Sequence, residues 1–363
     1  MSDRISSLAQ ALQSAGADAF FAWSPVAMGY LHGFHEGGGE RFLSLAVKAT
    51  GEVAMICPAL SATQAGRTGI ADVRSWRDGE DPLALFGRLA DEWHLKTGIL
   101  ALDDEMPAHM VLAMQEALPA ALFKAGGPLL AGIMRVKQSG ELDLMRRAAR
   151  IADDALAAGL AAIRPGATER EVSEALSTAM SKAGGKPTFS IVAAGKNGAE
   201  PHHMTDETRI ERGDVVILDF GCDVGGYQSD ITRTVACGEV SDEAKKVYEI
   251  VYAAQAAGRA AIQPGVAAGE IDRVTREVIE AAGFGEYFMH RTGHGIGMKG
   301  HEEPFIVGGN PMPLEPGHCF SVEPGIYLPG RFGVRIENIV TVTQEGHESL
   351  NDEPRPSIQV ISN

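Results

Sequence analysis

The sequence predicts an α/β protein of two domains, the second of which contains two similar halves. A length of 363 residues exceeds one ordinary core, given roughly 100–200 residues per domain. Strand-like apolar runs alternate with amphipathic segments of helical period over about the first 130 residues. A weak internal repeat follows, since AIRPGATEREV at 162–172 is echoed by AIQPGVAAGEI at 261–271, ninety-nine residues later. These observations favour an α/β domain followed by a duplicated one.

The first domain is expected over residues 1–132. A helix to about Ala15 precedes the strand-like run DAFFAW, and a polar Gly-rich patch separates this run from FLSLAVKA and GEVAMICPA. A helix near 81–93, the strand KTGILALD and a helix near 108–118 follow. This alternation is typical of an α/β domain.

The second domain is expected over residues 133–363 and begins with one long amphipathic helix. Ser139 lies near the start of this helix, Glu141 lies in its first turn, and Pro165-Gly166 ends it. Each copy of the repeat ends one helix at Pro-Gly and begins another. Two similar α/β halves are therefore expected to face each other about a pseudo-twofold axis.

The composition restricts the partners and the location. The chain has 48 acidic and 32 basic residues, and its net charge of −16 repels phosphate backbones and anionic lipid, so neither nucleic acid nor a membrane is expected. No uninterrupted apolar segment indicates a signal peptide or a membrane span, and we expect a cytoplasmic protein. The four cysteines lack CxxC spacing, and three of them lie in apolar strand-like runs where burial is expected. A disulfide between Cys222 and Cys237 is conceivable across a hairpin, but it is not expected in a cytoplasmic protein.

Two aspartates in LDFGCDVGGYQSDITR (218–233) occupy unusual positions in what reads as a hairpin. If its turn is centred on Val224-Gly225, Asp219 lies directly opposite Asp230. Opposed Cβ atoms are roughly 4.5–5.5 Å apart, and two like charges at that separation are destabilising unless something neutralises them. The hairpin therefore predicts a bound cation.

A second pair of acids is expected to face each other across a hairpin in the same way. In CFSVEPGIYLPGRFGVRIENIV, a loop centred on Gly330 places Glu323 opposite Glu337. Glu323 follows Asp219 by 104 residues, which is close to the repeat period. Each half would then contribute one acidic hairpin to a shared site at the pseudo-axis. The alternative is that all four acids are ordinary polar positions on half-exposed strands.

A nitrogen ligand would help to select the metal. The segment HRTGHGIGMKGHEEP supplies three candidates, His290, His294 and His301, and spacing alone does not choose among them. One histidine with four carboxylates is enough for two divalent ions about 3.5–4 Å apart. Mixed carboxylate and imidazole ligands without thiolate favour manganese, cobalt, zinc or iron.

The ordered motifs LDFG, SDITRT, GHGIG with a following HE, VEPGIY and VRIEN resemble those of the pita-bread metallopeptidases, in particular the proline-specific branch that contains prolidase and aminopeptidase P. The resemblance covers the whole chain. It implies a creatinase-like N-terminal domain followed by a pseudo-twofold pita-bread catalytic domain. Carried over by position, it also implies five metal ligands, of which the second and the last bridge two ions: Asp219, Asp230, His294, Glu323 and Glu337.

The resemblance implies further roles at the site. His202 and His301 match two substrate-side histidines, which would donate hydrogen bonds to the carbonyl oxygen and the developing oxyanion. Glu323 would also act as the general base. Arg335 matches an arginine near the site and is a candidate for binding a proline carboxylate. Arg41, on a Gly-rich loop of the first domain, is a second candidate for that carboxylate, and a solvated loop charge is its alternative reading.

The implied activity is hydrolysis of the bond between an N-terminal residue and a following proline, with manganese as the expected metal and cobalt, zinc and iron as alternatives. An Xaa-Pro dipeptidase (prolidase) is expected, acting on dipeptides or short peptides. Aminopeptidase P activity on longer peptides is the alternative, and a non-enzymatic binding protein on the same fold is the third reading. The resemblance also implies a homodimer. His203, His290 and His318 are expected to be turn or packing residues rather than catalytic ones.

Overall fold

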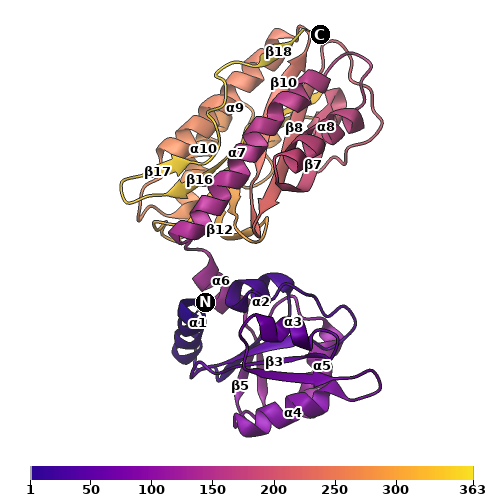
Figure 1. Cartoon of the computed structure of the whole chain (residues 1–363). Coiled ribbons are helices and arrows are strands. Elements are labelled where there is room, and N and C mark those ends of the chain that lie inside the picture. Colours follow the sequence, from indigo (N-terminus) through magenta and orange to yellow (C-terminus); the bar gives the residue numbers. More distant parts are fainter. Residues whose placement is uncertain (1, 363) are drawn as a thin grey trace. The chain divides into compact units, whose positions relative to one another are not determined.

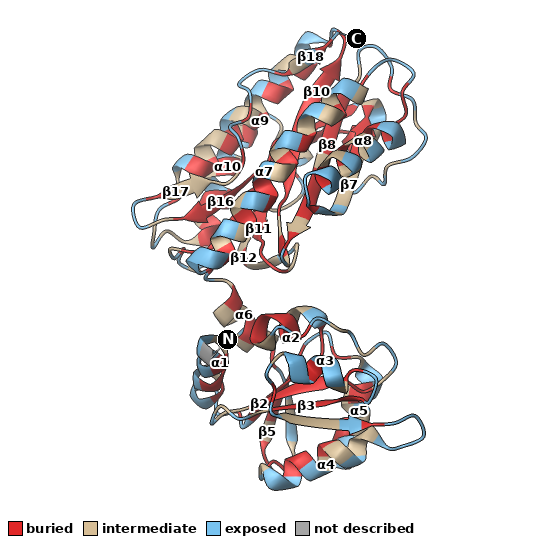
Figure 2. Cartoon of the chain, in the orientation of Figure 1, coloured by how far each residue is buried: buried red, intermediate tan, exposed pale blue. Residues whose placement is uncertain are grey.

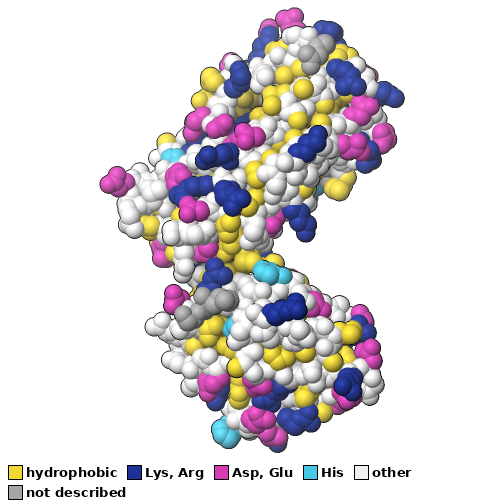
Figure 3. Space-filling view, in the orientation of Figure 1, with side chains coloured by type: hydrophobic (Ala, Val, Ile, Leu, Met, Phe, Trp, Pro, Cys, Tyr) yellow, Lys and Arg dark blue, Asp and Glu magenta, His cyan; other side chains and the backbone are white. Residues whose placement is uncertain are grey.

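The computed structural model describes residues 2–362 and divides the chain into two compact units, Met1–Met134 and Arg135–Asn363 (Figure 1). Each unit has a hydrophobic core of its own. Among the residues described, no helix combines the length and the apolar character needed to cross a membrane. On the face that Figure 3 shows, Lys and Arg side chains stand among Asp and Glu side chains.

The N-terminal unit is a six-stranded mixed sheet with the strand order β4-β3-β2-β1-β5-β6. The first three strands of the chain pair antiparallel, and β5, β6 and β4 are added in parallel. Its elements are α1 (Ser2–Ser14), β1 (Ala19–Ala22), α2 (Pro25–His32), β2 (Ser44–Lys48), β3 (Val53–Pro58), α3 (Ala62–Arg67), β4 (Asp72–Trp76), α4 (Pro82–Glu92), β5 (Ile99–Leu102), α5 (Ala108–Ala117), β6 (Leu122–Ala125) and α6 (Gly127–Met134).

The sequence pattern predicts seven elements of this unit, α1, β1, β2, β3, α4, β5 and α5, and misses the others. The missed elements are α2, α3, β4, β6 and α6. Strands β4 and β6 lie at the two edges of the sheet, and their residues are mostly half-buried or exposed. An edge strand covered on fewer sides needs no apolar run, so its pattern is weak. Helix α2 begins with Pro25 after the capping residue Ser24, and because a Ser-Pro pair is also typical of a turn, the pattern does not predict the helix.

The first half of the catalytic unit consists of two helices packed on an antiparallel sheet. Its elements are α7 (Ser139–Ala162), α8 (Glu169–Lys182), β7 (Lys186–Ala194), the 3₁₀ turn η1 (Gly195–Ala199), β8 (Val215–Val224), β9 (Tyr227–Gln228) and β10 (Ile231–Cys237). Helix α7 buries small residues against the sheet (Figure 2). At Gly159 a Cβ would overlap the Leu176 side chain of α8, so a glycine allows the two helices to approach closely.

The second half repeats this plan with shorter strands. Its elements are α9 (Asp242–Ala260), α10 (Ala268–Ala281), η2 (Gly285–Tyr287), β11 (Gly293–Gly295), β12 (Glu302–Ile306), β13 (Cys319–Val322), β14 (Gly325–Leu328), β15 (Phe332–Arg335), β16 (Asn338–Val342), β17 (His347–Ser349) and β18 (Gln359–Ile361). Strand β18 returns to pair in parallel with β10 in the first sheet.

Matching backbone hydrogen bonds support the internal duplication. Gly166 N donates to Ile210 O at 2.8 Å just before α8, and Gly265 N donates to Leu314 O at 2.7 Å just before α10. In both halves the Pro-Gly turn between the two helices is thus tied to a segment that leads into a central strand. The repeat seen in the sequence is therefore a repeat of structure.

The two halves meet where β10 lies beside β15. Thr234 Oγ1 donates to Arg335 O at 2.7 Å, and Glu337 N donates to Thr232 O at 3.1 Å. These bonds bring the acidic hairpin of the first half against that of the second. The thiols of the four cysteines are free, as expected, and all four residues are buried: Cys57, Cys222, Cys237 and Cys319.

The register of the first hairpin differs from the prediction. The turn is formed by Gly225 and Gly226, both with positive φ (64° and 89°), one residue later than expected. A tight two-residue turn of this kind requires positive φ at both central positions, which Val224 would adopt only with strain. As a result Asp219 pairs with Thr232, and the prediction that it faces Asp230 directly is wrong. The offset is two residues, so the aspartates keep the same face and are diagonal neighbours.

The register of the second hairpin agrees with the prediction. Val322 pairs with Asn338 on one side, and Gly325 pairs with Arg335 on the other. Glu323 and Glu337 lie at matching positions in the short breaks between these strand pairs. The two glutamates therefore face each other, but at interruptions of the strands rather than within them.

Candidate active site

Three side chains from different elements form the centre of the candidate site. Ligand atoms of Asp230, His294 and Glu337 all lie within 4.8 Å of one another, and all three residues are buried. Asp230 immediately precedes β10, His294 lies in β11, and Glu337 lies between β15 and β16. Glu323 joins them, with its Oε1 3.2 Å from His294 Nε2. Among the three histidines that the spacing left open, His294 is thus the one among the carboxylates.

The fourth acid, Asp219, is held by Arg335. The guanidinium donates from Nη2 to Asp219 Oδ2 at 2.6 Å, from Nε to Thr232 Oγ1 at 3.1 Å and from Nη1 to the Tyr327 hydroxyl at 3.0 Å. His290 Nε2 lies 2.8 Å from the same hydroxyl. Asp219 is therefore fixed by a buried network that begins in the other half of the unit.

The residues fit a group of divalent cations. Within residues 2–362, Asp230 Oδ1 and Glu337 Oε1 are buried atoms without a hydrogen-bond partner, and both belong to the central cluster. Buried carboxylate oxygens are rarely left unpaired, because their desolvation is costly. Oxygen donors around one imidazole, with no thiolate, suit manganese, iron, cobalt or zinc.

The electrostatics of the protein alone also call for positive charge. Burial raises the pKa of Asp230 and of Glu337 well above the ordinary values, and neighbouring carboxylates raise both further. Burial also raises the pKa of Glu323. Burial lowers the pKa of His294 to about 4, which keeps the imidazole neutral and able to bind a cation. Like charges packed this closely are destabilising unless protons or a bound cation neutralise them.

Two hydroxyl residues that the sequence reasoning missed orient the acids. Thr232 Oγ1 donates to Glu337 Oε2 at 2.7 Å, and Ser321 Oγ donates to Glu323 Oε1 at 2.9 Å. Each hydroxyl lies two residues from an acid on the same strand path, the first from Asp230 and the second from Glu323. The alternation of faces along a strand could have identified both.

The two expected substrate-side histidines are exposed, unlike the central cluster. The ring centroids of His301 and His294 are 3.7 Å apart with a 31° tilt, so His301 borders the cluster directly. His202 lies in the loop after η1. Its neighbour His203 bonds the buried Glu169, and His318 is wholly buried.

The remaining expected site residue, Arg41, lies in the N-terminal unit. Its guanidinium donates to Asp78 at 3.2 Å, and Nη1 lies 3.5 Å from Glu40 Oε1. About a third of the side chain is exposed, at 36%. The structure thus gives Arg41 local acidic partners.

Comparison with known proteins agrees with this geometry. The protein family described as "Metallopeptidase family M24" matches residues 143–344. The family described as "Creatinase/Prolidase N-terminal domain" matches residues 4–134. A probable dipeptidase PepE of Mycobacterium tuberculosis is 38% identical over 96% of this chain and 94% of its own length. An Xaa-Pro dipeptidase of Lactobacillus delbrueckii subsp. lactis is 38% identical over 92% of this chain and 93% of its own.

A solved structure shows the same fold. The dipeptidase PepE from Mycobacterium ulcerans has a TM-score of 0.93 and 36% identity, and the alignment covers 99% of this chain and 98% of that one. The fold and the acidic centre are those of a metal-dependent peptidase with a creatinase-type N-terminal domain. The chain belongs to metallopeptidase family M24.

Proposed function

We propose that this protein is an Xaa-Pro dipeptidase that holds two divalent metal ions. The buried cluster of Asp230, His294 and Glu337, with two unpaired carboxylate oxygens, carries the proposal. The printed names of its relatives, dipeptidase and Xaa-Pro dipeptidase, support the substrate class. Manganese is the proposed metal, and a homodimer is the proposed assembly.

The five ligands proposed for the ions are Asp219, Asp230, His294, Glu323 and Glu337. Asp230 and Glu337, whose oxygens are the unpaired ones, would bridge the two ions. When bound, the ions would polarise the scissile carbonyl of the substrate and lower the pKa of a bound water molecule toward neutrality. Arg335 donates hydrogen bonds to Asp219 and to the Tyr327 hydroxyl and so keeps Asp219 in place.

Proton transfer and oxyanion binding fall to side chains at the edge of the cluster. Glu323 is the proposed general base, and its Oε1 already accepts from Ser321 Oγ, which orients the carboxylate. His301, stacked on His294, and His202 would donate hydrogen bonds to the carbonyl oxygen as negative charge develops on it. A proline nitrogen has no N–H, so the site needs no acceptor for that position.

A dipeptidase must also bind the carboxylate of the proline. Arg335 and Arg41 are the two candidate cations. Three of the nitrogens of Arg335 bond Asp219, Thr232 and Tyr327, and the residue is 5% exposed, so fixing Asp219 is its better-supported role. Arg41 is accessible and bonds exposed acids, which a substrate carboxylate could replace. If Arg41→Ala leaves the preference for a dipeptide over a longer peptide unchanged, this role is excluded.

One assay series tests the proposal. An Xaa-Pro dipeptide and the matched Xaa-Pro tripeptide are assayed after chelation and after return of manganese, cobalt, zinc or iron. We expect chelation to abolish hydrolysis, manganese to restore it best, and the dipeptide to be preferred. Activity indifferent to the chelator overturns the metallopeptidase mechanism, and preference for the tripeptide makes the enzyme an aminopeptidase P. Size-exclusion chromatography with light scattering measures the molar mass in solution and so tests for the dimer.

A further inference from the structure

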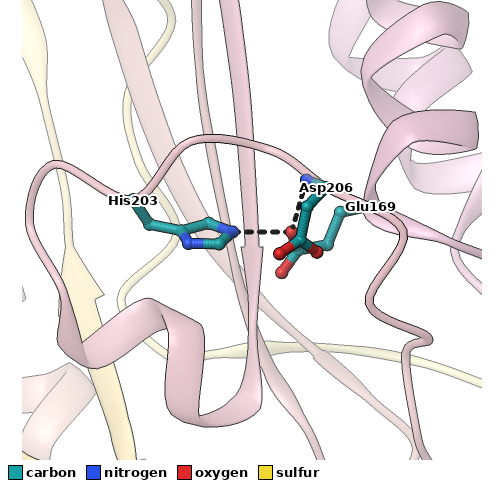
Figure 4. Close-up of side chains that lie close together, drawn as sticks. All are labelled: Glu169, His203 and Asp206. Carbon is teal, nitrogen blue, oxygen red and sulfur yellow. Dashed lines mark hydrogen bonds and ion pairs between the residues drawn. The ribbon is translucent and has the colours of Figure 1, made fainter.

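A second group of polar side chains lies around Glu169, apart from the central cluster of Asp230, His294 and Glu337 (Figure 4). Glu169 is the first residue of α8, and its side chain is wholly buried. Its Oε1 accepts from Ala194 N at 2.8 Å and from Asn197 Nδ2 at 3.0 Å. Its Oε2 accepts from Asp206 N at 3.2 Å and lies 2.7 Å from His203 Nε2. One carboxylate thus bonds four points of a single segment, 194–206.

The four bonds enclose the turn that carries His202. His203 N donates to Glu200 O at 3.0 Å, so Glu200 to His203 form a β-turn with Pro201 in its second position, where proline is favoured. His202 is the third residue of this turn and is exposed. Asn197 binds Glu169 before the turn, and His203 binds it after the turn. The backbone on both sides of His202 is therefore attached to one buried anchor.

The anchored segment lies beside the metal cluster. It leaves β7, in which Ile191 pairs with Asp219 of β8. Its η1 turn packs on the β14–β15 hairpin so closely that a Cβ on Gly333 would collide with Gly198 O. The loop thus runs between two elements that supply residues of the site.

A cation is a poor occupant for the Glu169 group. Both carboxylate oxygens already receive N–H donors, two of them from the backbone, and a cation would have to displace these. The position at the N-terminus of α8 further stabilises a negative charge without any metal. The group is better explained as a fixed support than as a binding site.

We infer that Glu169 is a positioning residue that holds His202 toward the substrate, an inference that rests on the proposed function. A carboxylate suits this task because both of its oxygens accept. Glutamine would place an NH₂ group against two of the four N–H donors and leave these buried groups unsatisfied, which is unfavourable. The turn would then be attached on one side only, and His202 would lose its fixed direction.

The test is a double-mutant cycle of Glu169→Gln and His202→Ala on the full, metal-loaded enzyme. Loss of one oxyanion donor lowers kcat by roughly 100-fold to 1,000-fold. We expect E169Q to lower kcat by about 10-fold or more with a small change in KM, and to lower it by less than about 2-fold in the H202A background, because residues acting as a unit are not additive. Fully additive effects, or an H202A enzyme with unchanged kcat, overturn the inference.

A second measurement does not depend on turnover. Amide hydrogen exchange should accelerate in E169Q at Ala194 or at Asp206, whichever amide faces the introduced NH₂ group, and unchanged exchange at both amides overturns the inference. Glu207→Gln is the matched control, since Glu207 directly follows this segment but pairs with the exposed Arg170. It should leave kcat and both amides unchanged.

A milder variant covers the case in which E169Q fails to fold. His203→Ala removes one of the four bonds to Glu169 and should give a smaller loss of kcat that also vanishes in H202A. A loss that persists in H202A overturns the inference. A wild-type enzyme that does not cleave Xaa-Pro peptides would refute the proposed function, whereas the exchange data would still report on the anchor itself.

Discussion

Arg335 Nη2 donates to Asp219 Oδ2 at 2.6 Å, and both side chains are largely inaccessible, at 7% and 15% exposure. The pair joins the two halves of the catalytic unit, because Asp219 lies in β8 and Arg335 ends β15. It therefore ties one candidate metal ligand to the hairpin that supplies two others.

Arg335→Met should cost the metal-free protein about 3–5 kcal/mol of unfolding free energy, since it leaves a buried carboxylate without its partner. Urea unfolding measures the change. Arg331→Met is the control: Arg331 lies in the same hairpin but pairs with Glu243 at the surface, where an ion pair contributes about 0–1 kcal/mol. Equal costs for the two variants would show that the Arg335 pair is not effectively buried.

Asp230→Asn or Glu337→Gln should weaken metal binding by at least about 100-fold, the upper range seen when only a second-shell partner is lost. Each substitution removes one of the two unpaired buried oxygens that suit a bridging role. Titration of the chelated protein with manganese, followed calorimetrically, measures the affinity.

Asp223→Asn is the control for these ligand variants. Asp223 belongs to the same hairpin but caps its turn, accepting from Gly226 N at 3.1 Å, and an asparagine can keep this bond. Its affinity for manganese should equal that of the wild type. If D230N binds as tightly as D223N, Asp230 is not a ligand.

Lys137 and Glu302 form an ion pair that is almost fully buried, with exposures of 1% and 9%. Glu302 follows His301 directly, so the pair fixes the segment that carries a substrate-side histidine. Lys137→Met should cost about 3–5 kcal/mol, and the double variant with Glu302→Gln should recover part of this loss because no unpaired charge remains. A double variant no more stable than K137M would contradict the electrostatic explanation.

Asp153 gives a pH-dependent stability that can be measured away from the metal cluster. Burial raises its pKa to about 6 in the folded protein, from 3.8. The folded state then binds more protons than the unfolded state between these values, so this residue lowers stability as pH rises from about 4 to about 6. The effect is at most about 3 kcal/mol.

Asp153→Asn should remove this part of the pH dependence. An asparagine oxygen can still accept from Asp352 N, which bonds Asp153 at 2.9 Å. Thermal unfolding of chelated wild type and variant at several pH values provides the comparison. Parallel curves for the two proteins would show that Asp153 titrates normally.

Much of the catalytic unit could be predicted because its signals are local. The Pro-Gly helix ends, the amphipathic period of α7 and the acids at corresponding places of two hairpins are all visible in short windows of sequence. The edge strands β4 and β6 could not, because their residues are only partly covered and carry no strong pattern.

The sequence by itself determined the residue types of the candidate site and the two hairpins that carry its acids, since turn chemistry and strand alternation act over a few residues. Tertiary structure alone decided the pairing of Arg335 with Asp219 and the four bonds to Glu169. Those choices satisfy buried charges and N–H groups, whose partners lie up to 116 residues apart in the chain. Which partner meets each group is set by the packing of the two halves.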